Sequence, residues 1–275
     1  MLTFPCSKIN IGLNVVARRP DGYHDLQTVF YPIPLTDTLE TRPLRCSNAP
    51  YALQQTGIKA TASAEENIVV KVFRDLQEEF SLPPTDIYLR KKIPTGAGLG
   101  GGSSDAAAMI TLLNEEHALG LTTDDMERRI AAYGADCAFF INHRPCYATG
   151  IGDQLQPLAL SLKGLTLLLV KPQEAISTRE AYAGITPQPS DVDLREVLQR
   201  PVREWRDVVT NDFEGSVFPN HPSLPAIKET LYDMGALYAS MSGSGSTMYG
   251  IFPHPLGYAK KVFTDCFVFE RRFDV

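Results

Sequence analysis

Apolar and polar positions follow a strand-like pattern near the start of the chain. Residues 9–17 and 26–33 are apolar and rich in strand-forming side chains, and the charged stretch 18–22, with its proline and glycine, separates them. This pattern predicts two strands joined by a turn. Residues 40–63 are mixed and turn-rich, which predicts short strands. Residues 86–93 alternate apolar and polar side chains, so we expect a half-exposed strand there.

Helical periodicity then follows in the first half of the chain. Apolar residues stand at helical spacing after Asn67, namely Ile68, Val69, Val72, Phe73 and Leu76. A second helix is expected directly after a glycine-rich run, with Ser103 or Ser104 as its N-cap. Asp105 would then lie in its positive first turn, and Gly120 would be its C-cap.

Strands and helices alternate irregularly in the rest of the chain. Thr122 or Thr123 is expected to cap a third helix that ends near Gly134. A break rich in small residues predicts a domain boundary, with an N-terminal domain of residues 1–150 and a C-terminal domain of residues 151–275. The further elements expected are a buried strand at 165–170, helices at 193–198 and 224–234, a strand–turn–strand at 241–252 and a helix at 255–263. This irregular order favours α+β packing over a doubly wound sheet.

Composition limits the class of protein. The chain has 275 residues, of which 44% are hydrophobic, and this is ordinary for a globular protein of one large or two modest domains. Its net charge of −6 argues against a nucleic-acid partner. The longest apolar run, 165–170, is far shorter than the roughly 20 residues that span a bilayer. The five cysteines form no Cys-x-x-Cys pair, so we expect reduced thiols in a cytoplasmic protein. From the charge and the short apolar runs we expect that it binds neither nucleic acid nor membrane.

The strongest functional signal is the glycine-rich run before the second expected helix. Five of the seven residues from Gly96 to Gly102 are glycine. Without a Cβ, several consecutive N–H groups can turn toward one anion, and a helix that starts directly afterwards adds its own unpaired N–H groups. We interpret the run as a phosphate-binding loop, with a flexible surface loop as the alternative. Its residues are Pro94, Thr95, Gly96, Ala97, Gly98, Leu99, Gly100, Gly101, Gly102, Ser103 and Ser104.

Two common phosphate motifs do not describe this run. Gly96, Gly98 and Gly101 match the spacing of a dinucleotide-binding fingerprint, but the preceding strand is charged on one face and no apolar strand directly follows the helix. The run also lacks the Gly-Lys-Ser/Thr ending of a P-loop. The hydroxyls of Ser103 and Ser104 are suited to contact phosphate or a bound magnesium ion.

Two charged residues in apolar surroundings are candidates for transfer chemistry. Asp136 lies among small and apolar residues, where a carboxylate is costly unless it is paired or used. We interpret it as a general base, with a structural capping role equally open. Lys8 shares one side of a strand with Asn10, while Ile9 and Ile11 face the other side. Such a lysine can hold a carboxylate or a transferring phosphoryl group, and the alternative is an edge-strand lysine in solvent.

Two turn segments complete the set of candidates. Tyr23 and His24 follow a Pro-Asp-Gly turn and offer a flat surface with polar nitrogens, which suits a nucleobase. The alternative is an ordinary turn beside a core aromatic residue. The segment 241–246, Met-Ser-Gly-Ser-Gly-Ser, could place backbone donors opposite the glycine run, or could be a plain hairpin connection.

Taken together and in this order, these segments resemble the GHMP kinases. The resemblance covers nearly the whole chain and rests above all on Lys8-Ile9-Asn10, on residues 18–30, on the glycine run and on residues 134–140. It implies a two-domain α+β GHMP kinase fold, with an N-terminal domain like domain 2 of ribosomal protein S5 and a ferredoxin-like C-terminal domain. It further implies an ATP-dependent small-molecule kinase of the branch whose acceptor alcohol carries a cytidine diphosphate group.

The resemblance also implies roles for single residues. Asp136 would be the general base, and Lys8 would orient it and stabilise charge. The run from Pro94 to Ser104 would hold the phosphates of ATP, and Asn67 and Lys91 would line the adenosine pocket. The residues that match the acceptor side are Asn10, Tyr23, His24, Thr178 and Tyr182. Mg²⁺ is the expected cofactor, although no distinctive acidic residue identifies its ligands.

Two departures and three alternatives accompany this interpretation. Ala138 stands where the family commonly has proline, and Tyr182 stands where phenylalanine is common, so stacking is kept and a hydroxyl is added. The alternatives are a kinase of the homoserine or mevalonate type, a non-catalytic nucleotide-binding module and a dinucleotide-dependent oxidoreductase. The Pro-Asp-Gly-Tyr-His stretch argues against the first, because those acceptors carry no nucleobase, and Lys8 with Asp136 argues against the second. We expect a monomer or a weak homodimer.

Overall fold

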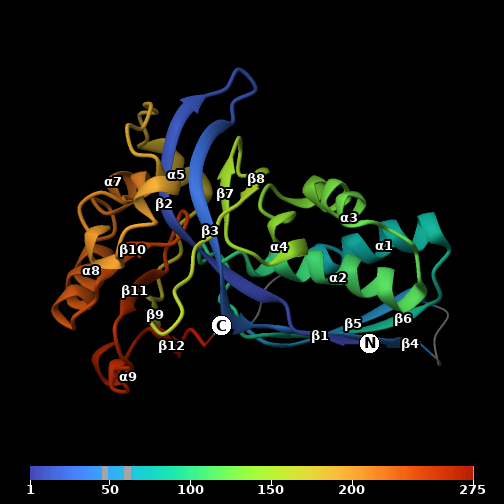
Figure 1. The fold of residues 1–275 in the computed structure, drawn as a ribbon. Helices are drawn as coiled ribbons and strands as arrows, with labels where there is room; N and C mark the ends of the chain where they lie inside the picture. The colour runs from blue at the N-terminus through green and yellow to red at the C-terminus, as the bar shows by residue number, and fades with distance from the viewer. Residues whose placement is uncertain (45–48, 59–62, 275) are drawn as a thin grey trace. The chain divides into compact units, whose positions relative to one another are not determined.

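The structure, a computed structural model, describes residues 1–44, 49–58 and 63–274 (Figure 1). Contacts within the chain divide it into two compact units. Both units are discontinuous in sequence. The first comprises Met1–Lys8, Leu35–Thr95 and Gly100–His143, and the second comprises Ile9–Pro34, Gly96–Leu99 and Arg144–Val275. The last change of unit falls between His143 and Arg144, close to residue 150. The division into domains 1–150 and 151–275 stays a prediction.

The first unit is built on a four-stranded sheet. Its strands in spatial order are β1 (Leu2–Thr3), β4 (Thr38–Pro43), β6 (Thr85–Lys91) and β5 (Tyr51–Gly57). The β1, β4 and β6 strands pair antiparallel, whereas β5 runs parallel to β6. Along β6, Ile87 and Leu89 are buried and Arg90 is exposed, which confirms the predicted half-exposed strand. The parts of the predicted short-strand region at 45–48 and 59–62 lie outside the described residues.

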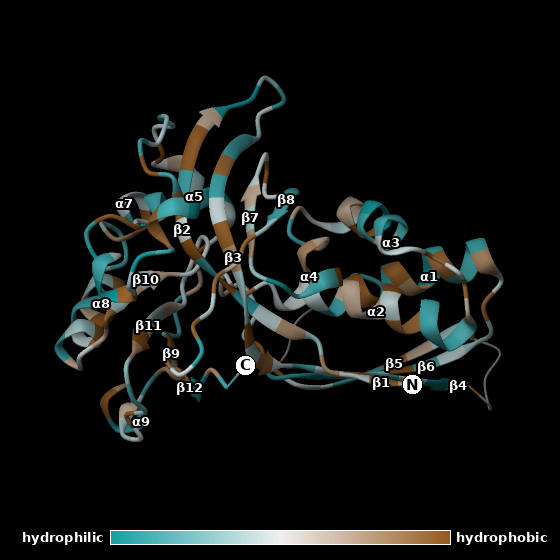
Figure 2. Cartoon of the chain, in the orientation of Figure 1, coloured by the Kyte–Doolittle hydropathy of each residue, from teal (hydrophilic) through white to brown (hydrophobic). Residues whose placement is uncertain are grey.

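Helices cover one face of this sheet. They are α1 (Ile68–Phe80), α2 (Gly101–His117), α3 (Thr123–Ile130), the 3₁₀ turn η1 (Ala131–Tyr133) and α4 (Phe139–Asn142). Helix α1 packs against α2, and its turns alternate hydrophobic and hydrophilic residues (Figure 2). The Asn67 side chain accepts a hydrogen bond from Val69 N at 2.9 Å and so caps α1. Thr122 caps α3 through a capping box with Asp125, as its sequence predicts.

Helix α2 ends earlier than its sequence predicts. The expected C-cap, Gly120, is wrong, because the helix stops at His117 and Ala118 adopts the left-handed conformation with φ +50. The Asn114 side chain binds both backbone polar groups of Leu121, with N···O distances of 2.9 and 3.1 Å. This side-chain link turns the chain away before Gly120 is reached.

The second unit contains two further sheets. One consists of β2 (Cys6–Arg18) and β3 (His24–Thr36), most of whose residues belong to this unit, together with β7 (Cys146–Thr149) and β8 (Gln154–Pro157). These bounds confirm the two long strands and the turn predicted near the start of the chain. Residue Thr28 of β3 pairs with Ala148 of β7, and the two strands run antiparallel.

The other sheet has a ferredoxin-like arrangement. Its strands are β9 (Thr166–Lys171), β10 (Tyr238–Met241), β11 (Met248–Phe252) and β12 (Phe267–Arg272), in the spatial order β10-β11-β9-β12 with antiparallel neighbours. The helices of this unit are α5 (Thr178–Ala183), α6 (Leu194–Val197), η2 (Val202–Glu204), α7 (Asp212–Val217), α8 (Ser223–Asp233) and α9 (Ala259–Val262). With α8 before β10 and α9 before β12, the pattern is βαββαβ, as the resemblance implies.

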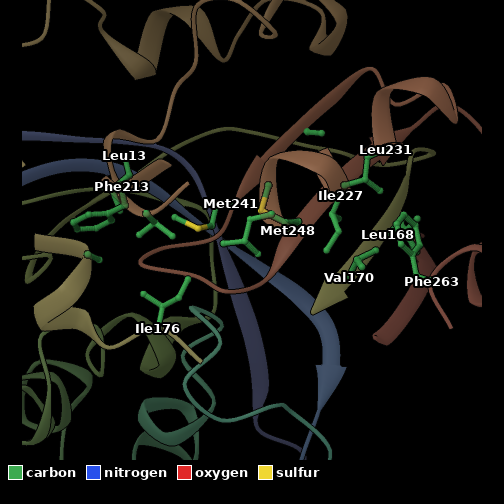
Figure 3. Packing of buried hydrophobic residues seen from close by; sticks show 14 of the residues in the cluster. Leu13, Leu168, Val170, Ile176, Phe213, Ile227, Leu231, Met241, Met248 and Phe263 are labelled. Atoms are coloured by element: carbon green, nitrogen blue, oxygen red, sulfur yellow. The ribbon is translucent and has the colours of Figure 1, made fainter. Parts of the chain in front are cut away.

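A core of buried apolar side chains holds this unit together. Val170 of β9 and Met248 of β11 belong to it, as do Ile227 and Leu231 of α8 (Figure 3). Phe213 of α7 lies at the other end of the same cluster. Among the described residues, no helix is long and apolar enough to cross a membrane.

Candidate active site

Helix α2 begins on the glycine run rather than on a serine. Its N-cap is Gly100, with φ +69 and no side-chain capping bond, so the expectation that Ser103 or Ser104 caps the helix is wrong. The left-handed conformation suits a residue without a Cβ. Because no side chain caps this end, the first N–H groups of the helix point beyond it without an intrahelical acceptor. An anion placed there would receive these hydrogen bonds and the positive end of the helix dipole.

The three consecutive glycines at this point have different neighbours. A Cβ on Gly100 would lie 2.6 Å from the Phe140 ring, and one on Gly101 would lie 2.8 Å from Cγ2 of Ile93. Packing within the protein therefore requires both residues to be glycine. A Cβ on Gly102 would meet no described atom within 4 Å. Gly102 is thus the position at which an external group can approach the backbone.

The ends of the run are held in different ways. Pro94 is buried and Thr95 is exposed. Ser103 lies within α2, and its hydroxyl interacts with the Cys137 thiol, whose pKa burial raises to about 12. The Ser104 hydroxyl is buried, and its oxygen has no hydrogen-bond partner among the described residues. An oxygen left without a partner fits a contact with phosphate or a divalent cation.

Asp136 and Lys8 lie together in the first unit. Asp136 sits in a turn between η1 and α4, where Cys137 N donates to Gly134 O at 3.1 Å. Its half-buried carboxylate reaches the start of α2, because Oδ2 lies 3.3 Å from the place of a Cβ on Gly100. Burial lowers the pKa of Lys8, and the Asp136 charge acts in the opposite direction. Lys8 is only 5% exposed, so it is not an edge-strand lysine in solvent.

Lys91 lies in a separate buried cluster. Its ammonium group donates to Oδ2 of Asp105 at 2.5 Å and also to Asp37. The other oxygen of Asp37 accepts from the backbone of Lys92 and from Ile93 N, the latter at 2.9 Å. The prediction that Asp105 occupies the first turn of α2 is wrong, because the helix starts at Gly101 and this carboxylate is turned inward to Lys91.

The two residues predicted to line an adenosine pocket have other tasks in the structure. The amide of Asn67 donates to Gln55 at 3.1 Å while its oxygen caps α1. The ammonium group of Lys91 is held by two carboxylates. The assignment of Asn67 and Lys91 to ATP stays a prediction.

The Gly96–Leu99 segment of the run belongs to the second unit. Ala97 and Leu99 are 2% and 1% exposed, so their side chains anchor it. Gly98 has φ +72, and a Cβ on it would lie 1.9 Å from the carbonyl oxygen of Ser242. The Ser242 hydroxyl donates to Gly98 O at 2.8 Å. The turn 241–246 thus lies against the glycine run, although it presents a carbonyl and a hydroxyl at this contact.

Asn10 is tied to the same turn. Its backbone N–H donates to the Ser242 hydroxyl at 3.2 Å, and its amide donates to Thr28 at 2.9 Å. Tyr249 of β11 donates its hydroxyl to Asn10 O at 2.8 Å. Asn10 is 3% exposed. Its role toward an acceptor stays a prediction.

An aromatic pair stands at the start of β3. The His24 ring stacks on Tyr182 of α5, with centroids 4.7 Å apart and planes 22° apart. Tyr23 is 61% exposed, so it is not a core aromatic residue beside an ordinary turn. Thr178 is an exposed residue at the start of α5, four positions before Tyr182 on the same helix. The histidine and the tyrosine that the resemblance assigns to a cytosine are therefore in contact with each other.

Comparison with known proteins gives the family. The model of the GHMP kinases N-terminal domain matches residues 67–144, and that of the GHMP kinases C-terminal domain matches residues 194–262. Together they cover more than half of the chain and both units contribute to the match. The chain belongs to the GHMP kinase family.

Similar proteins are found along the whole length of this GHMP kinase. A 4-diphosphocytidyl-2-C-methyl-D-erythritol kinase of Bacteroides fragilis is 51% identical over 270 residues, which are 98% of each chain. A protein of the same name from Chlorobium phaeobacteroides is 36% identical over 90% of this chain and 84% of its own. The crystal structure of a 4-(cytidine 5'-diphospho)-2C-methyl-D-erythritol kinase superposes with a TM-score of 0.82, at 29% identity and 98% coverage of both chains. The mevalonate kinase of Methanococcus jannaschii, at 13% identity and 99% and 98% coverage, has a TM-score of 0.72 and shares the fold.

Sequence patterns did not single out three residues of this GHMP kinase that hold its candidate site. They are Asp37, Asn211 and Phe213, and all three are buried. Asn-Asp-Phe-Glu at 211–214 is a recognisable helix start, so the capping role of Asn211 could have been found. The contact of Asp37 with Lys91 spans 54 positions and leaves no local signal. Among the described residues, no group of three or more His, Cys, Asp or Glu side chains is arranged to hold a metal ion.

Proposed function

We propose that this GHMP kinase transfers the γ-phosphoryl group of ATP to the 2-hydroxyl of 4-diphosphocytidyl-2-C-methyl-D-erythritol. The products would be the 2-phosphate and ADP, and the reaction belongs to non-mevalonate isoprenoid precursor biosynthesis. The observation that carries the proposal is the 51% identity, over 98% of both chains, to a protein named for this substrate. The stacked pair of His24 and Tyr182 supports a nucleobase on the acceptor.

The donor half of the proposed reaction is the glycine run. The N–H groups at the start of α2 hold the β- and γ-phosphates, since no side chain caps them and Gly102 leaves their approach open. Asn67 and Lys91 lie on the adenosine side. Phosphoryl transfer needs mainly such positioning and charge stabilisation, because little covalent chemistry is left to the protein.

The transfer step is assigned to Asp136 and Lys8. The Asp136 carboxylate takes the proton of the acceptor hydroxyl while the oxygen of that hydroxyl attacks the γ-phosphorus. The bond between the γ-phosphorus and the oxygen that links it to the β-phosphate breaks, and ADP is released. The Lys8 ammonium stands beside that carboxylate, where it keeps Asp136 oriented and stabilises the negative charge that develops on the transferring group. Asn10, Tyr23, His24, Thr178 and Tyr182 hold the acceptor.

Mg²⁺ is proposed to accompany the nucleotide. Such an ion takes most of its ligands from phosphate and water, with one or two protein oxygens. The buried Ser104 hydroxyl, which has no partner among the described residues, fits that requirement. The bound ion would neutralise phosphate charge. We further propose that the protein works in the cytoplasm as a monomer or a weak homodimer.

A coupled assay tests the function. The purified protein is mixed with ATP, Mg²⁺ and the diphosphocytidyl alcohol, and ADP release and the 2-phosphate product are measured. Parallel reactions contain homoserine or mevalonate at the same concentration. We expect turnover with the diphosphocytidyl alcohol and none above background with the other two. Preferred phosphorylation of either alternative alcohol would overturn the proposed acceptor and leave the kinase assignment in place.

A further inference from the structure

The inference concerns the four residues that start α7, namely Asn211, Asp212, Phe213 and Glu214. Asn211 is 3% exposed, and its amide donates to Met241 O at 2.8 Å and to Gly243 O at 2.9 Å. Its oxygen accepts from Phe213 N at 3.0 Å and so caps the helix. One side chain therefore begins α7 and also holds two carbonyls of the turn 241–246.

Glu214 fixes the same turn from the other side. Its Oε1 accepts from Met241 N at 2.8 Å and from the Ser240 hydroxyl at 3.0 Å. Both backbone polar groups of Met241 are thus bound by side chains of one short segment. Since buried polar groups are costly to leave unpaired, these bonds define where β10 ends and the turn begins.

The turn 241–246 also contacts Gly98 of the glycine run. Between the two carbonyls that Asn211 holds lies Ser242, whose hydroxyl donates to Gly98 O at 2.8 Å. The carbonyl oxygen of Ser242 occupies the space of a Cβ on Gly98. A shift of the turn by a fraction of an ångström would therefore move the backbone of Gly98.

Phe213 reaches a different group. It is 3% exposed, and its ring meets the Tyr182 ring edge-on, with centroids 4.8 Å apart and planes 80° apart. Phe213 belongs to the same apolar cluster as Leu13 (Figure 3). The Tyr182 ring also stacks on His24, with centroids 4.7 Å apart. Phe213 is thus the buried support of the ring that the proposed function places against a cytosine.

Asp212 connects the segment to β2. Its Oδ2 accepts from Val15 N at 2.7 Å, and burial raises the pKa of its carboxyl group. Successive side chains of one helix start therefore reach the long strand, the turn beside the glycine run and the aromatic ring.

We propose that Asn211 and Phe213 are positioning residues of this kinase, Asn211 for the nucleotide through the turn 241–246 and Phe213 for the nucleobase of the acceptor through Tyr182. This inference rests on the proposed function for the identity of the two ligands. Neither residue touches a ligand. Asn211 acts through the turn 241–246 and Gly98, whereas Phe213 acts through Tyr182, so the two effects are separable although the residues are two positions apart.

The experiment compares Asn211→Ser with Phe213→Leu. Serine keeps an oxygen that can cap α7 and loses both bonds to the turn carbonyls. Leucine keeps an apolar side chain and loses the ring edge against Tyr182. ADP and CDP are the probes, and their dissociation constants are measured by isothermal titration with the full-length protein. We expect Asn211→Ser to weaken ADP binding about tenfold and Phe213→Leu to weaken CDP binding about threefold to tenfold, each leaving the other probe within about twofold.

A matched control and a second variant complete the design. Val217→Ala removes buried apolar volume at the far end of α7, so it should lower the melting temperature and leave both dissociation constants within about twofold. Ser242→Ala removes the next link to Gly98 and replaces Asn211→Ser in the comparison if that variant does not fold; it should weaken ADP binding more than Val217→Ala does. The inference is overturned if Asn211→Ser and Phe213→Leu weaken both probes equally, or if neither weakens its own probe more than Val217→Ala does.

Failure of the proposed function has a different signature. If the wild-type protein binds ADP but not CDP, the proposal that the acceptor contains cytidine is wrong. The ADP affinities of Asn211→Ser and Val217→Ala would still decide whether the turn positions the nucleotide.

Discussion

Two buried lysines of the first unit have opposite surroundings. Lys8 is 5% exposed and Lys91 is 2% exposed, so water is nearly excluded from both. Lys91 lies between Asp37 and Asp105, which are themselves buried. Lys8 stands beside Asp136, whose carboxylate is half-buried at the open start of α2. Burial lowers the pKa of Lys8, and the Asp136 charge opposes that shift.

The difference in their acidic neighbours separates a lysine that stabilises the fold from one that can act on a substrate. A lysine held by two fixed carboxylates has its charge balanced inside the protein, and removing it leaves two buried anions. A lysine beside one accessible carboxylate can still respond to a third charge that arrives with a substrate. Burial alone therefore does not distinguish the two lysines, whereas the accessibility of the carboxylates beside them does.

The largest expected effect is at Asp136. Replacing Asp136 by asparagine keeps the shape and removes the base, so kcat should fall about 10²- to 10⁴-fold while the affinity for ADP stays unchanged. Steady-state kinetics with a titration of ADP measures both quantities. A variant within about tenfold of the wild-type kcat would show that this carboxylate is not the base. The proximity of Lys8 to Asp136 would then give no reason to assign Lys8 a role in the transfer step.

Lys91→Met should act on stability instead. Two buried carboxylates lose their shared partner, so the free energy of unfolding should fall by about 3 to 5 kcal/mol, as urea denaturation measures. The matched variant Lys8→Met should lower kcat strongly and stability by less, since Asp136 is half-exposed to water. Lys92→Ala is the exposed control and should leave both quantities nearly unchanged. Equal loss of stability in Lys8→Met and Lys91→Met would break the comparison.

Asp105 gives the cluster around Lys91 a pH dependence. Burial raises the pKa of its carboxyl from 3.8 to about 7, with Asp37 acting in the same direction and Lys91 against it. Because the folded-state pKa is the higher one, the contribution of this group to stability is complete below pH 3.8 and is lost as the pH rises through about 7. Asp105→Asn should flatten the curve of unfolding free energy between pH 3.8 and about pH 7. The difference from wild type should reach at most about 4 kcal/mol.

An unchanged pH profile in Asp105→Asn would contradict the assignment of this titration. Denaturation of Lys91→Met over the same pH range is the companion measurement. Its loss of stability should grow as the pH rises through about 7, where Asp105 becomes ionised without a cationic partner.

The smallest effect is expected on the alkaline side of the pH profile of kcat. The pKa of Lys8 lies below the ordinary value of 10.5 because the side chain is buried. Its ammonium group should therefore lose its proton, and kcat should decline, before that pH is reached. Lys8→Arg keeps its charge over this range, so the alkaline decline should disappear even if the maximal rate is lower. A decline that persists in Lys8→Arg would assign it to another group.

Local signals account for much of what the sequence predicted correctly. Thr122 caps its helix as expected, and Asn67 caps the helix that was predicted to follow it, since each acts on backbone groups two or three positions away. The alternation along β6 revealed its buried face. The glycine run, with Gly98 and Gly100 at positive φ, was recognised because only glycine tolerates so many of those conformations.

The errors and omissions share a physical cause. Ser103 was a reasonable N-cap by residue type, but packing of Gly100 and Gly101 against Phe140 and Ile93 starts α2 earlier. Ala118 adopts a conformation that is costly for alanine, because the Asn114 side chain fixes the following residues. In each case, tertiary contacts override local preference, and a single sequence does not show them.

Long-range contacts explain the limits at the site as well. The Asn211 amide binds carbonyls about 30 positions away, and Lys91 meets Asp37 across 54 positions. No periodicity or motif encodes such pairings. The tasks of Asp136 and Lys8 were proposed from residue type and resemblance, and the structure adds that they are electrostatic neighbours.

The change of unit between Lys8 and Ile9 limits how this protein can be divided or rearranged. Residues 9–34 and 96–99 are assigned to the unit that otherwise comprises residues 144–275, so a gene cut after residue 143 would leave the C-terminal product without part of its own unit. A fragment of residues 144–275 would lack the strand segment that carries Asn10 and Leu13. Exchanging residues 1–143 between relatives would also exchange residues 9–34, which belong to the same unit as residues 144–275. The heritable module is thus the whole chain, and recombination within it should be productive only when β2 and β3 travel with the C-terminal sequence.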